Sequence, residues 1–241
     1  MCYQYSLVKP KKEIESFFDV EIPWDVYPQY FINGFDFKPQ LCITDHGAML
    51  LNWGLIPHWV KHIDQANQIR VKTLNARSES AFEKDSFRDA ISSHRCIVPM
   101  SGFFDSHHFG TTKVPYYVFP RDKSLWGLAG IWTSWKDPYS NEIIESFSIL
   151  TMPANPLMAK IHNSKQRMPV ILEKAAFDAW VDPTLKRDEI ENMFMEYEDG
   201  SMDYYPLNSL VNRSIPSSLR NVPEVLEKRN YDPLSQGSLF N

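Results

Sequence analysis

The stretch RCIVPMSGFFD, residues 95–105, decides the fold class because it is an almost unbroken run of strand-favouring residues. Three more strand-like runs follow it, each bounded by turn residues: PYYVF (115–119), LWGLAGIW (125–132) and IIESFSILT (143–151). Successive strands joined by short connections usually pair with their neighbours. We therefore predict an antiparallel meander across the middle third of the chain.

Helical and strand-like segments alternate on either side of this region. Apolar residues recur at helical spacing in five segments: KKEIESFF (11–18), SFRDAISSH (86–94), ANPLMAKIH (154–162), KAAFDAWVD (174–182) and RDEIENMFMEY (187–197). Strand-like runs include LCI (41–43), AMLLNW (48–53), RMPVIL (167–172) and YYPLN (204–208). There is no internal repeat and no strict β-α-β alternation, so we predict one α+β domain over residues 1–228 and a tail over 229–241.

Composition indicates a folded, soluble protein. Of 241 residues, 43% are apolar and 23% are charged, and no window approaches the ~18 apolar residues of a membrane helix. The N-terminus lacks the pattern of a secretion signal, so we expect a cytoplasmic protein. Three widely spaced cysteines argue against a disulfide framework or a zinc site, and we expect no metal or cofactor. The net charge of −5 does not exclude nucleic acid, because binding depends on local patches.

Cys2 follows the initiator methionine directly. Removal of Met1, which a small second residue permits, would leave a cysteine whose α-amine and thiol sit on adjacent carbons. Both groups have reference pKa values near 8, so a fraction of each is nucleophilic at neutral pH. Such a 1,2-aminothiol captures an aldehyde as a thiazolidine. Position alone also fits an incidental small residue, and both interpretations stay open at this point.

Four further side chains are candidates for chemistry. Asn75 and Arg77 lie two apart in TLNARSES, so an extended backbone would point both to one face, to hold a polar group and a phosphate. Asp105 ends the strand-like run above and could transfer protons. His162 follows a predicted helix and could act as an acid near neutral pH. The pair His107–His108 does not predict a metal site, because neighbours on a strand face opposite ways.

Aromatic and cationic residues near these candidates suggest a surface for single-stranded nucleic acid. Bases stack on aromatic rings, and cations bind the phosphates. Core packing is the alternative for the tryptophans, and a structural role is the alternative for His162. The predicted contacts are Trp53, Trp59, Arg70, Lys72, Arg77, Lys165 and Arg167.

These motifs occur together in the order typical of one family. MC at the start, WGLIP-x-W (53–59), LNAR-x-E (74–79), GFF-D (102–105), IH (161–162) and RMPVIL (167–172) resemble the SRAP (SOS response-associated peptidase) family, whose members crosslink to abasic sites in single-stranded DNA. The resemblance covers residues 2 to about 225. It implies a single SRAP-like domain with a mainly antiparallel, barrel-like β core flanked by helices.

The resemblance also implies roles for single residues. Cys2 would form a thiazolidine with the ring-opened abasic sugar and so shield the lesion from strand cleavage. Asn75 matches the site asparagine, and Asp105 stands where the family has an acid/base glutamate. His162 matches the histidine associated with opening the sugar and reversing the crosslink, and Arg77 matches a phosphate contact. We expect a monomer associated with the nucleoid.

The chain departs from the family pattern at three places. Tyr3 and Gln4 replace the usual glycine and arginine of MCGR. Asp105 is one methylene shorter than glutamate, so we expect slower proton transfer, helped by a water or by closer backbone. Four residues, 163–166, separate His162 from Arg167, a longer link than the common H-x-RMP. This looks like a divergent bacterial branch.

The end of the chain carries a further motif. Gln236, Leu239 and Phe240 resemble the Q-x-x-L-F motif by which bacterial proteins dock on the replication sliding clamp, although an ordinary frayed terminus fits as well. Two other functions also stay open: a thiol peptidase that removes its own Met1 with Cys2, His162 and Asp105, and a non-covalent binder of single-stranded DNA.

Overall fold

The computed structural model describes residues 2–208 and 215–234, which form two β-sheets and a set of short helices. The strands are β1 (Gln4–Leu7), β2 (Gln29–Asn33), β3 (Pro39–Thr44), β4 (Gly47–Trp53), β5 (Asn75–Arg77), β6 (Arg95–Met100), β7 (Gly102–Phe109), β8 (Thr112–Pro120), β9 (Trp126–Lys136), β10 (Ile143–Pro153), β11 (Arg167–Pro169), β12 (Ile171–Leu172) and β13 (Met202–Pro206). The α-helices are α1 (Lys11–Phe18), α2 (Ile63–Arg70), α3 (Arg88–Ser93), α4 (Pro156–Ile161), α5 (Phe177–Val181), α6 (Arg187–Glu191) and α7 (Ser217–Arg220). The predicted α+β class is confirmed.

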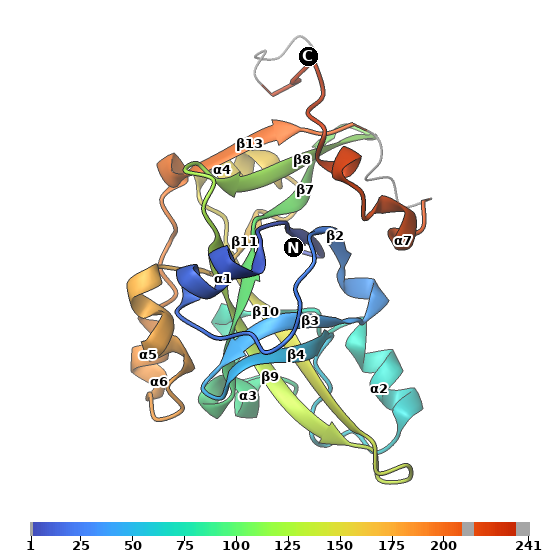
Figure 1. The fold of residues 1–241 in the computed structure, drawn as a ribbon, viewed down its shortest axis with the longest axis vertical. Coiled ribbons are helices and arrows are strands. Elements are labelled where there is room, and N and C mark those ends of the chain that lie inside the picture. Colours follow the sequence, from blue (N-terminus) through green and yellow to red (C-terminus); the bar gives the residue numbers. More distant parts are fainter. Residues whose placement is uncertain (1, 209–214, 235–241) are drawn as a thin grey trace.

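Five strands of the larger sheet close into a ring. β3 pairs with β4 and β6, β6 pairs with β9, β9 pairs with β10, and β10 returns to β4. Only the pairing of β10 with β4 is parallel within this ring. β5, β11 and β12 are attached to the same sheet. The predicted barrel-like and mainly antiparallel core is therefore confirmed, and it forms the lower half of the molecule in Figure 1.

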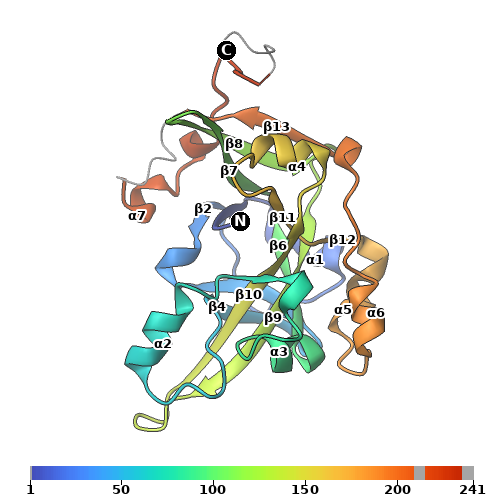
Figure 2. The same cartoon turned by 180° about the vertical axis from the view of Figure 1, so that it is seen from behind.

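A second sheet of five strands, in the order β13-β8-β7-β1-β2, lies at the other end of the molecule. Its central strand, β7, pairs with β8 on one side and with β1 on the other. Figures 1 and 2 show the N-terminal strand between the barrel and the β7–β8 hairpin, near the middle of the molecule. The chain therefore begins inside the fold and not at its edge.

The predicted meander is wrong. β7 and β8 pair with each other, but β8 then pairs with β13, while β9 pairs with β6 and β10. The chain changes sheet between β6 and β7, where Ser101 donates its N–H to the Ser6 carbonyl at 2.8 Å and Gly102 continues opposite Ser6. Both edges of β6 are already occupied by β3 and β9, so β7 finds its partner in β1.

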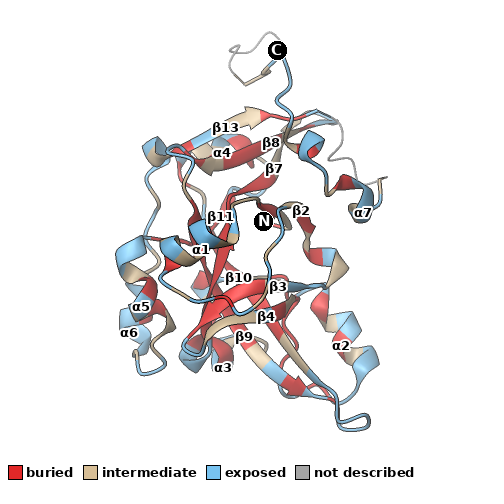
Figure 3. Ribbon diagram, viewed as in Figure 1, coloured by how far each residue is buried: buried red, intermediate tan, exposed pale blue. Residues whose placement is uncertain are grey.

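One apolar core joins the two sheets. It includes Cys2 and Tyr5 beside the barrel interior, and Figure 3 shows the buried residues concentrated along the strands. The predicted helix over 187–197 is shorter, because α6 ends at Glu191 and only Ile190 of it is buried. α2 was not predicted, since it buries only Ala66 and Arg70, and it begins where His62 Nδ1 accepts the Gln65 N–H at 3.2 Å.

The described part of the predicted tail packs against the domain. Arg229 donates its N–H to the Pro206 carbonyl at 2.8 Å, and the Tyr116 hydroxyl donates to Asp232 Oδ1 at 2.8 Å. Residues 229–234 therefore lie along β8 and β13. The clamp-like residues Gln236, Leu239 and Phe240 lie outside the described residues. Within the described ranges, none of the helices has the length and apolar character needed to cross a membrane.

Candidate active site

The site is built around Cys2, which lies just ahead of β1 and is only 1% exposed. β1 is held between β2 and β7, with Tyr5 opposite Phe103 in the antiparallel register. Asp105 therefore lies two residues further along β7 in the direction of Cys2. The Cys2 thiol donates a weak hydrogen bond to the Gln4 carbonyl, with 3.9 Å between Sγ and O.

Asn75 is brought to Cys2 by β5, which pairs in parallel with β10. Asn75 Nδ2 donates to the Cys2 carbonyl at 2.9 Å, across 73 residues of sequence. Its Oδ1 atom is buried and has no hydrogen-bond partner among the described residues. A buried acceptor without a donor is costly, so this oxygen is suited to an N–H that arrives with the substrate or with the Cys2 amine.

Asp105 and His162 form an ion pair in which Oδ2 and Nδ1 lie 3.5 Å apart. Both side chains are largely buried, with 11% and 8% of their surface exposed. His162 Nδ1 also lies 2.9 Å from the Arg167 carbonyl oxygen and 3.4 Å from the Arg167 backbone nitrogen. The Arg167 backbone thus holds the imidazole ring in place against Asp105. Asp105 Oδ1 accepts the Ser106 N–H at 2.8 Å.

Burial dominates the electrostatics of both reactive groups. Loss of solvent is the main cause that raises the pKa of the Cys2 thiol to about 12, and the nearby Asp105 charge acts in the same direction. Burial also raises the pKa of Asp105, although attraction to His162 opposes this shift. The thiol is therefore protonated at neutral pH, and it needs a proton acceptor when it reacts.

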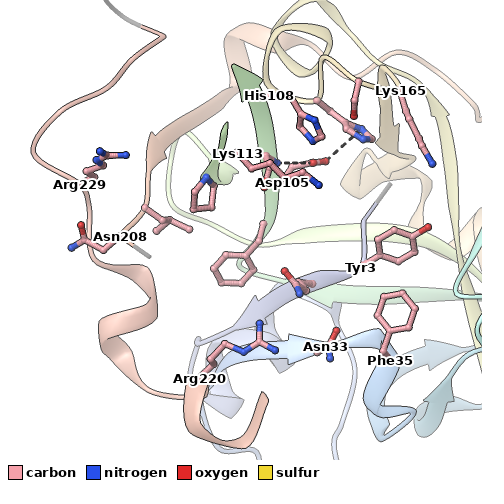
Figure 4. A pocket seen from close by; sticks show the side chains of 17 residues that line it. Tyr3, Asn33, Phe35, Asp105, His108, Lys113, Lys165, Asn208, Arg220 and Arg229 are labelled. Atoms are coloured by element: carbon pink, nitrogen blue, oxygen red, sulfur yellow. Dashed lines mark hydrogen bonds and ion pairs between the residues drawn. The ribbon is translucent and has the colours of Figure 1, made fainter. Parts of the chain in front are cut away.

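Asp105 and His162 lie in the wall of a cleft of about 1120 Å³ (Figure 4). At one side of it the rings of Tyr3 and Phe35 lie close together, with 5.2 Å between their centroids. Asp105 is the one carboxylate among the described residues that line the cleft. The lining cations are Lys113, Lys165, Arg220 and Arg229, joined by His108 and His162. The cleft is thus locally basic in a chain of net charge −5.

Three residues predicted to contact DNA are buried, and this corrects that prediction. Trp53 is 1% exposed and donates Nε1 to the Leu74 carbonyl at 2.8 Å. Arg70 is 8% exposed, lies over the Phe37 ring and donates to the Phe37 carbonyl at 3.0 Å. Both side chains thus have structural partners instead of an open face, Trp53 beside Asn75 and Arg70 at Phe37.

Arg167 is the third buried residue among the predicted DNA contacts. Its guanidinium pairs with Glu79 and donates to the Thr151 carbonyl at 2.6 Å. The Arg167 backbone carbonyl is also the partner of His162 Nδ1. Arg167 therefore orients the histidine and does not face the cleft. A single buried arginine leaves no periodic pattern in the sequence, so the sequence alone does not distinguish Arg167 from an exposed arginine.

The other predicted DNA contacts are exposed. Lys165 lines the cleft, whereas Trp59, Lys72 and Arg77 are exposed outside it. Trp59 is 38% exposed and donates Nε1 to the Asp85 carbonyl at 3.2 Å. These four residues remain predictions as contacts of nucleic acid.

The long link after His162 is tied to β7. Asn163 accepts the His108 N–H through Oδ1 at 2.9 Å and donates Nδ2 to the His108 carbonyl at 2.9 Å. The His107 ring lies between the Lys160 carbonyl, 2.6 Å from its Nδ1, and Asn163 Nδ2, 3.2 Å from its Nε2. The two histidines thus face different surroundings, and among the described residues no three His, Cys, Asp or Glu side chains are grouped as metal ligands.

Sequence reasoning missed several residues that line the cleft, among them Tyr3 and four others. Phe35, Lys113, Arg220 and Arg229 belong to no motif, and Tyr3 was noted only as a departure from a pattern. They come from four separate segments that only the tertiary fold brings together. Asn33 likewise reaches the cleft from the end of β2.

Comparison with known proteins agrees with this fold. The abasic site processing protein YoqW of Bacillus subtilis (strain 168) is 35% identical over 179 residues, covering 73% of this chain and 75% of that protein. YoaM of the same organism, also described as an abasic site processing protein, is 29% identical and covers 96% and 100%. A crystal structure of a protein from Bacteroides thetaiotaomicron is 33% identical, with a TM-score of 0.88 over 95% of this chain and all of that one.

The family match extends over most of the chain. Residues 1–214 match the family model described as SOS response associated peptidase (SRAP), and α7 with the residues after it lies beyond the match. The chain therefore belongs to the SOS response associated peptidase family.

Proposed function

We propose that this protein recognises abasic sites in single-stranded DNA and crosslinks to them through Cys2 after Met1 is removed. The names of its relatives support abasic sites as the substrate. The observation that carries the proposal is the buried Asp105–His162 pair beside a cysteine whose carbonyl is held by Asn75. An aminothiol and an acid/base pair are the groups that aldehyde capture needs.

The reaction balances without a cofactor. The abasic sugar opens when a base removes the C1′ hydroxyl proton and an acid protonates the ring oxygen, and Asp105 and His162 are suited to these two transfers. The Cys2 amine adds to the aldehyde, and the resulting carbinolamine loses water to form an imine. The thiol then gives its proton to a base, and its sulfur adds to the imine carbon while the nitrogen takes up a proton. The product is a thiazolidine plus one water.

The high pKa of the thiol assigns a task to Asp105. A thiol with a pKa of about 12 is almost wholly protonated at neutral pH, so the attack on the imine requires removal of its proton. Asp105 acts electrostatically on Cys2, and its own raised pKa makes it a stronger base than an exposed aspartate. We assign it as the acceptor of the thiol proton.

The decisive experiment uses an oligonucleotide with one abasic site. The protein is incubated with it, and the product is separated on a denaturing gel and weighed by intact mass. We expect an adduct whose mass is the sum of Met1-processed protein and DNA less one water. Cys2→Ala should form none, whereas Cys42→Ala, which removes another buried thiol, should react like the wild type. Equal adduct formation by Cys2→Ala would refute the mechanism.

The same geometry supports a second candidate, removal of Met1 by the protein itself. A cysteine beside an Asp–His pair resembles the arrangement of a thiol peptidase. In that case His162→Ala would retain Met1 in a host with normal methionine aminopeptidase, and intact mass would detect it. A third candidate function is non-covalent binding of single-stranded DNA. It predicts that the affinity for DNA falls steeply with salt concentration and that no adduct forms.

A further inference from the structure

Arg220 is a buried cation that has no ionic partner in the part of the chain that the structure describes. It is 4% exposed, it lines the cleft, and its Nε and Nη1 atoms have no hydrogen-bond partner. Its Nη2 lies 3.3 Å from Ser217 Oγ, and its guanidinium stacks over the Phe31 ring at 4.2 Å. Buried charges in proteins are ordinarily paired, because losing solvent is costly.

Two other buried arginines are paired more fully, whereas Arg70, which does not line the cleft, resembles Arg220: it stacks on Phe37 and its Nε has no hydrogen-bond partner among the described residues. Arg95, 1% exposed, donates to the carbonyls of Trp180, Ile91, Ser92 and Asp182. Arg167 is paired with Glu79 and Thr151. The Asp36 carboxylate acts on Arg220 through its charge. Its Oδ1 atom already accepts hydrogen bonds from Asn33 Nδ2 and Ser217 Oγ.

The segment that carries Arg220 is fixed to the domain. Asn221 Oδ1 accepts the N–H groups of Tyr30 and Phe31 at 2.7 and 3.1 Å, which anchors the end of α7 to β2. Arg229, further along the same segment, lies on the same side of the cleft (Figure 4). Both residues lie beyond the part of the chain that matches the family model.

We propose that Arg220 binds a phosphate at the end of the cleft away from Lys165, and that Arg229, which lies apart from it on the same side, contacts the same strand further along. Figure 4 shows the two arginines across the cleft from Lys165, with Asp105 and Lys113 nearer to Lys165. A cleft of about 1120 Å³ exceeds the size of ordinary small-molecule pockets, so it has room for more than one sugar. A strand with its abasic sugar at Asp105 thus presents a neighbouring phosphate to Arg220, whose donors match phosphate oxygens.

This inference rests on the proposed function only for the choice of DNA as the source of the phosphate. The phosphate is either an internal phosphodiester or a terminal monoester at a strand end, and both present the same oxygens. The test therefore uses an undamaged single strand, so it does not depend on whether an adduct forms. A failed crosslinking experiment would therefore not contradict the inference that Arg220 binds a phosphate.

The measurement is affinity for a fluorescent oligonucleotide by anisotropy over a range of salt concentrations. Arg220→Gln should weaken binding about tenfold or more, as for loss of a hydrogen bond to a charged group. It should also lower the slope of log K against log salt by about 0.7, as for one phosphate contact. Arg220→Lys, which retains the charge, should restore most of the slope. Arg229→Gln should lower the slope in the same direction.

Arg187→Gln is the matched control, because it removes an exposed arginine of α6 paired with Glu83 and Glu191. Figure 1 places α6 and α7 on opposite sides of the molecule. Its salt slope should equal that of the wild type. Oligonucleotides with and without terminal phosphates separate the two sources: sensitivity to Arg220 that requires a terminal phosphate identifies the strand end, and equal sensitivity identifies the internal phosphodiester.

Thermal unfolding without DNA separates binding from a structural role. An unpaired buried charge does not stabilise the free protein, so Arg220→Gln should not lower the Tm. Salt slopes unchanged in both Arg220→Gln and Arg229→Gln would overturn the proposal. So would a lowered Tm for Arg220→Gln accompanied by an unchanged slope.

Discussion

Asn75 joins two roles in one side chain. Its amide nitrogen fixes the Cys2 carbonyl at 2.9 Å, while its oxygen is buried without a donor. The first contact positions the N-terminal residue of the processed chain. The second provides an acceptor beside it, where a substrate hydroxyl or the Cys2 amine can donate. A single residue thus holds the nucleophile and contributes to its surroundings.

We expect Asn75→Ala to slow adduct formation about tenfold, because a hydrogen bond of about 1.4 kcal/mol is lost and Cys2 gains freedom. The measurement is a single-turnover time course on a denaturing gel. Asn52→Ala is the matched control, since Asn52 Nδ2 also donates to a backbone carbonyl, that of Glu145 at 3.0 Å. Equal rates for the two variants would remove Asn75 from the site.

The raised pKa of Asp105 predicts a pH dependence. Because burial disfavours the carboxylate, Asp105 loses its proton at a higher pH than an exposed aspartate, whose pKa is about 3.9. Its basic form therefore increases as pH rises through that raised pKa, and the adduct rate should rise with it. The Cys2 amine adds a second rise near pH 8.

Asp105→Asn should abolish the lower of these two rises and leave the upper one. The rate is measured from acid pH to pH 9 with saturating protein. A lower rise that survives in Asp105→Asn would assign it to another group. Asp105→Glu restores the carboxylate with the family's usual length, so it should keep both rises.

At the scale of elements, the segment from α4 to β11 explains how a longer link keeps His162 in place. α4 ends at Ile161, and Asn163 ties the link to β7 through two hydrogen bonds. The chain then returns so that the Arg167 carbonyl meets His162 Nδ1. The added residues form a loop anchored at both ends, so the family's histidine position is compatible with this longer spacing.

Glu79 supports this segment through Arg167, and its stability contribution depends on pH. Hydrogen bonding to Arg167 lowers the pKa of Glu79 from 4.5 to about 2. Since the folded pKa is the lower one, the contribution is fully present above pH 4.5 and is lost as pH falls towards 2. Glu79→Gln should remove this pH dependence and cost about 1 kcal/mol at pH 7, discounted because the carboxylate is partly exposed.

Urea denaturation at pH 3 and pH 7 measures both effects. Glu83→Gln is the control, because Glu83 pairs with Arg187 at the surface and both side chains are about half exposed. It should change stability less than Glu79→Gln does. If the two variants lose the same free energy of unfolding, the pair of Glu79 with the buried Arg167 adds no more stability than a surface ion pair does.

Local patterns predicted much of the fold but not how the strands pair. The helix over residues 11–18 and the strand-like runs at 41–43 and 48–53 agree with α1, β3 and β4, because each has its own period or turn boundaries. The pairing of β7 with β1 joins residues almost 100 positions apart, and no local signal encodes it. The same holds for the burial of Trp53 and Arg70, whose partners come from Leu74 and Phe37.

At the scale of the whole molecule, the local charge of the cleft is opposite in sign to the net charge of the chain. The chain carries −5 overall, yet the described residues of the cleft include four Lys or Arg side chains and one carboxylate. A low-dielectric cleft concentrates such a field and attracts a polyanion despite an unfavourable total. The cleft residues come from four strands of the five-stranded sheet, from the link after α4 and from the α7 segment, so this field exists only in the folded protein.

The clamp-like tail gives a prediction of its own. Deleting residues 236–241 should abolish capture by a bacterial sliding clamp in a pull-down, since the two apolar residues of the motif are removed. Adduct formation should be unchanged, because none of the described residues of the site belongs to the deleted segment. The double substitution Leu239→Ala and Phe240→Ala should match the deletion, and undiminished capture would dismiss the motif.

The burial of Cys2 limits how long an aminopeptidase can reach the start of the chain during synthesis. The proposed chemistry requires an aminopeptidase to reach the start of the chain, but the folded protein leaves only 1% of Cys2 exposed. Access ends when β1 is enclosed by β2 and β7, and β7 begins at residue 102. A ribosome adds about 5–20 residues per second, so this interval lasts about 5–20 s. Copies that still carry Met1 after this interval would depend on its removal by the folded protein itself, the second candidate function given above.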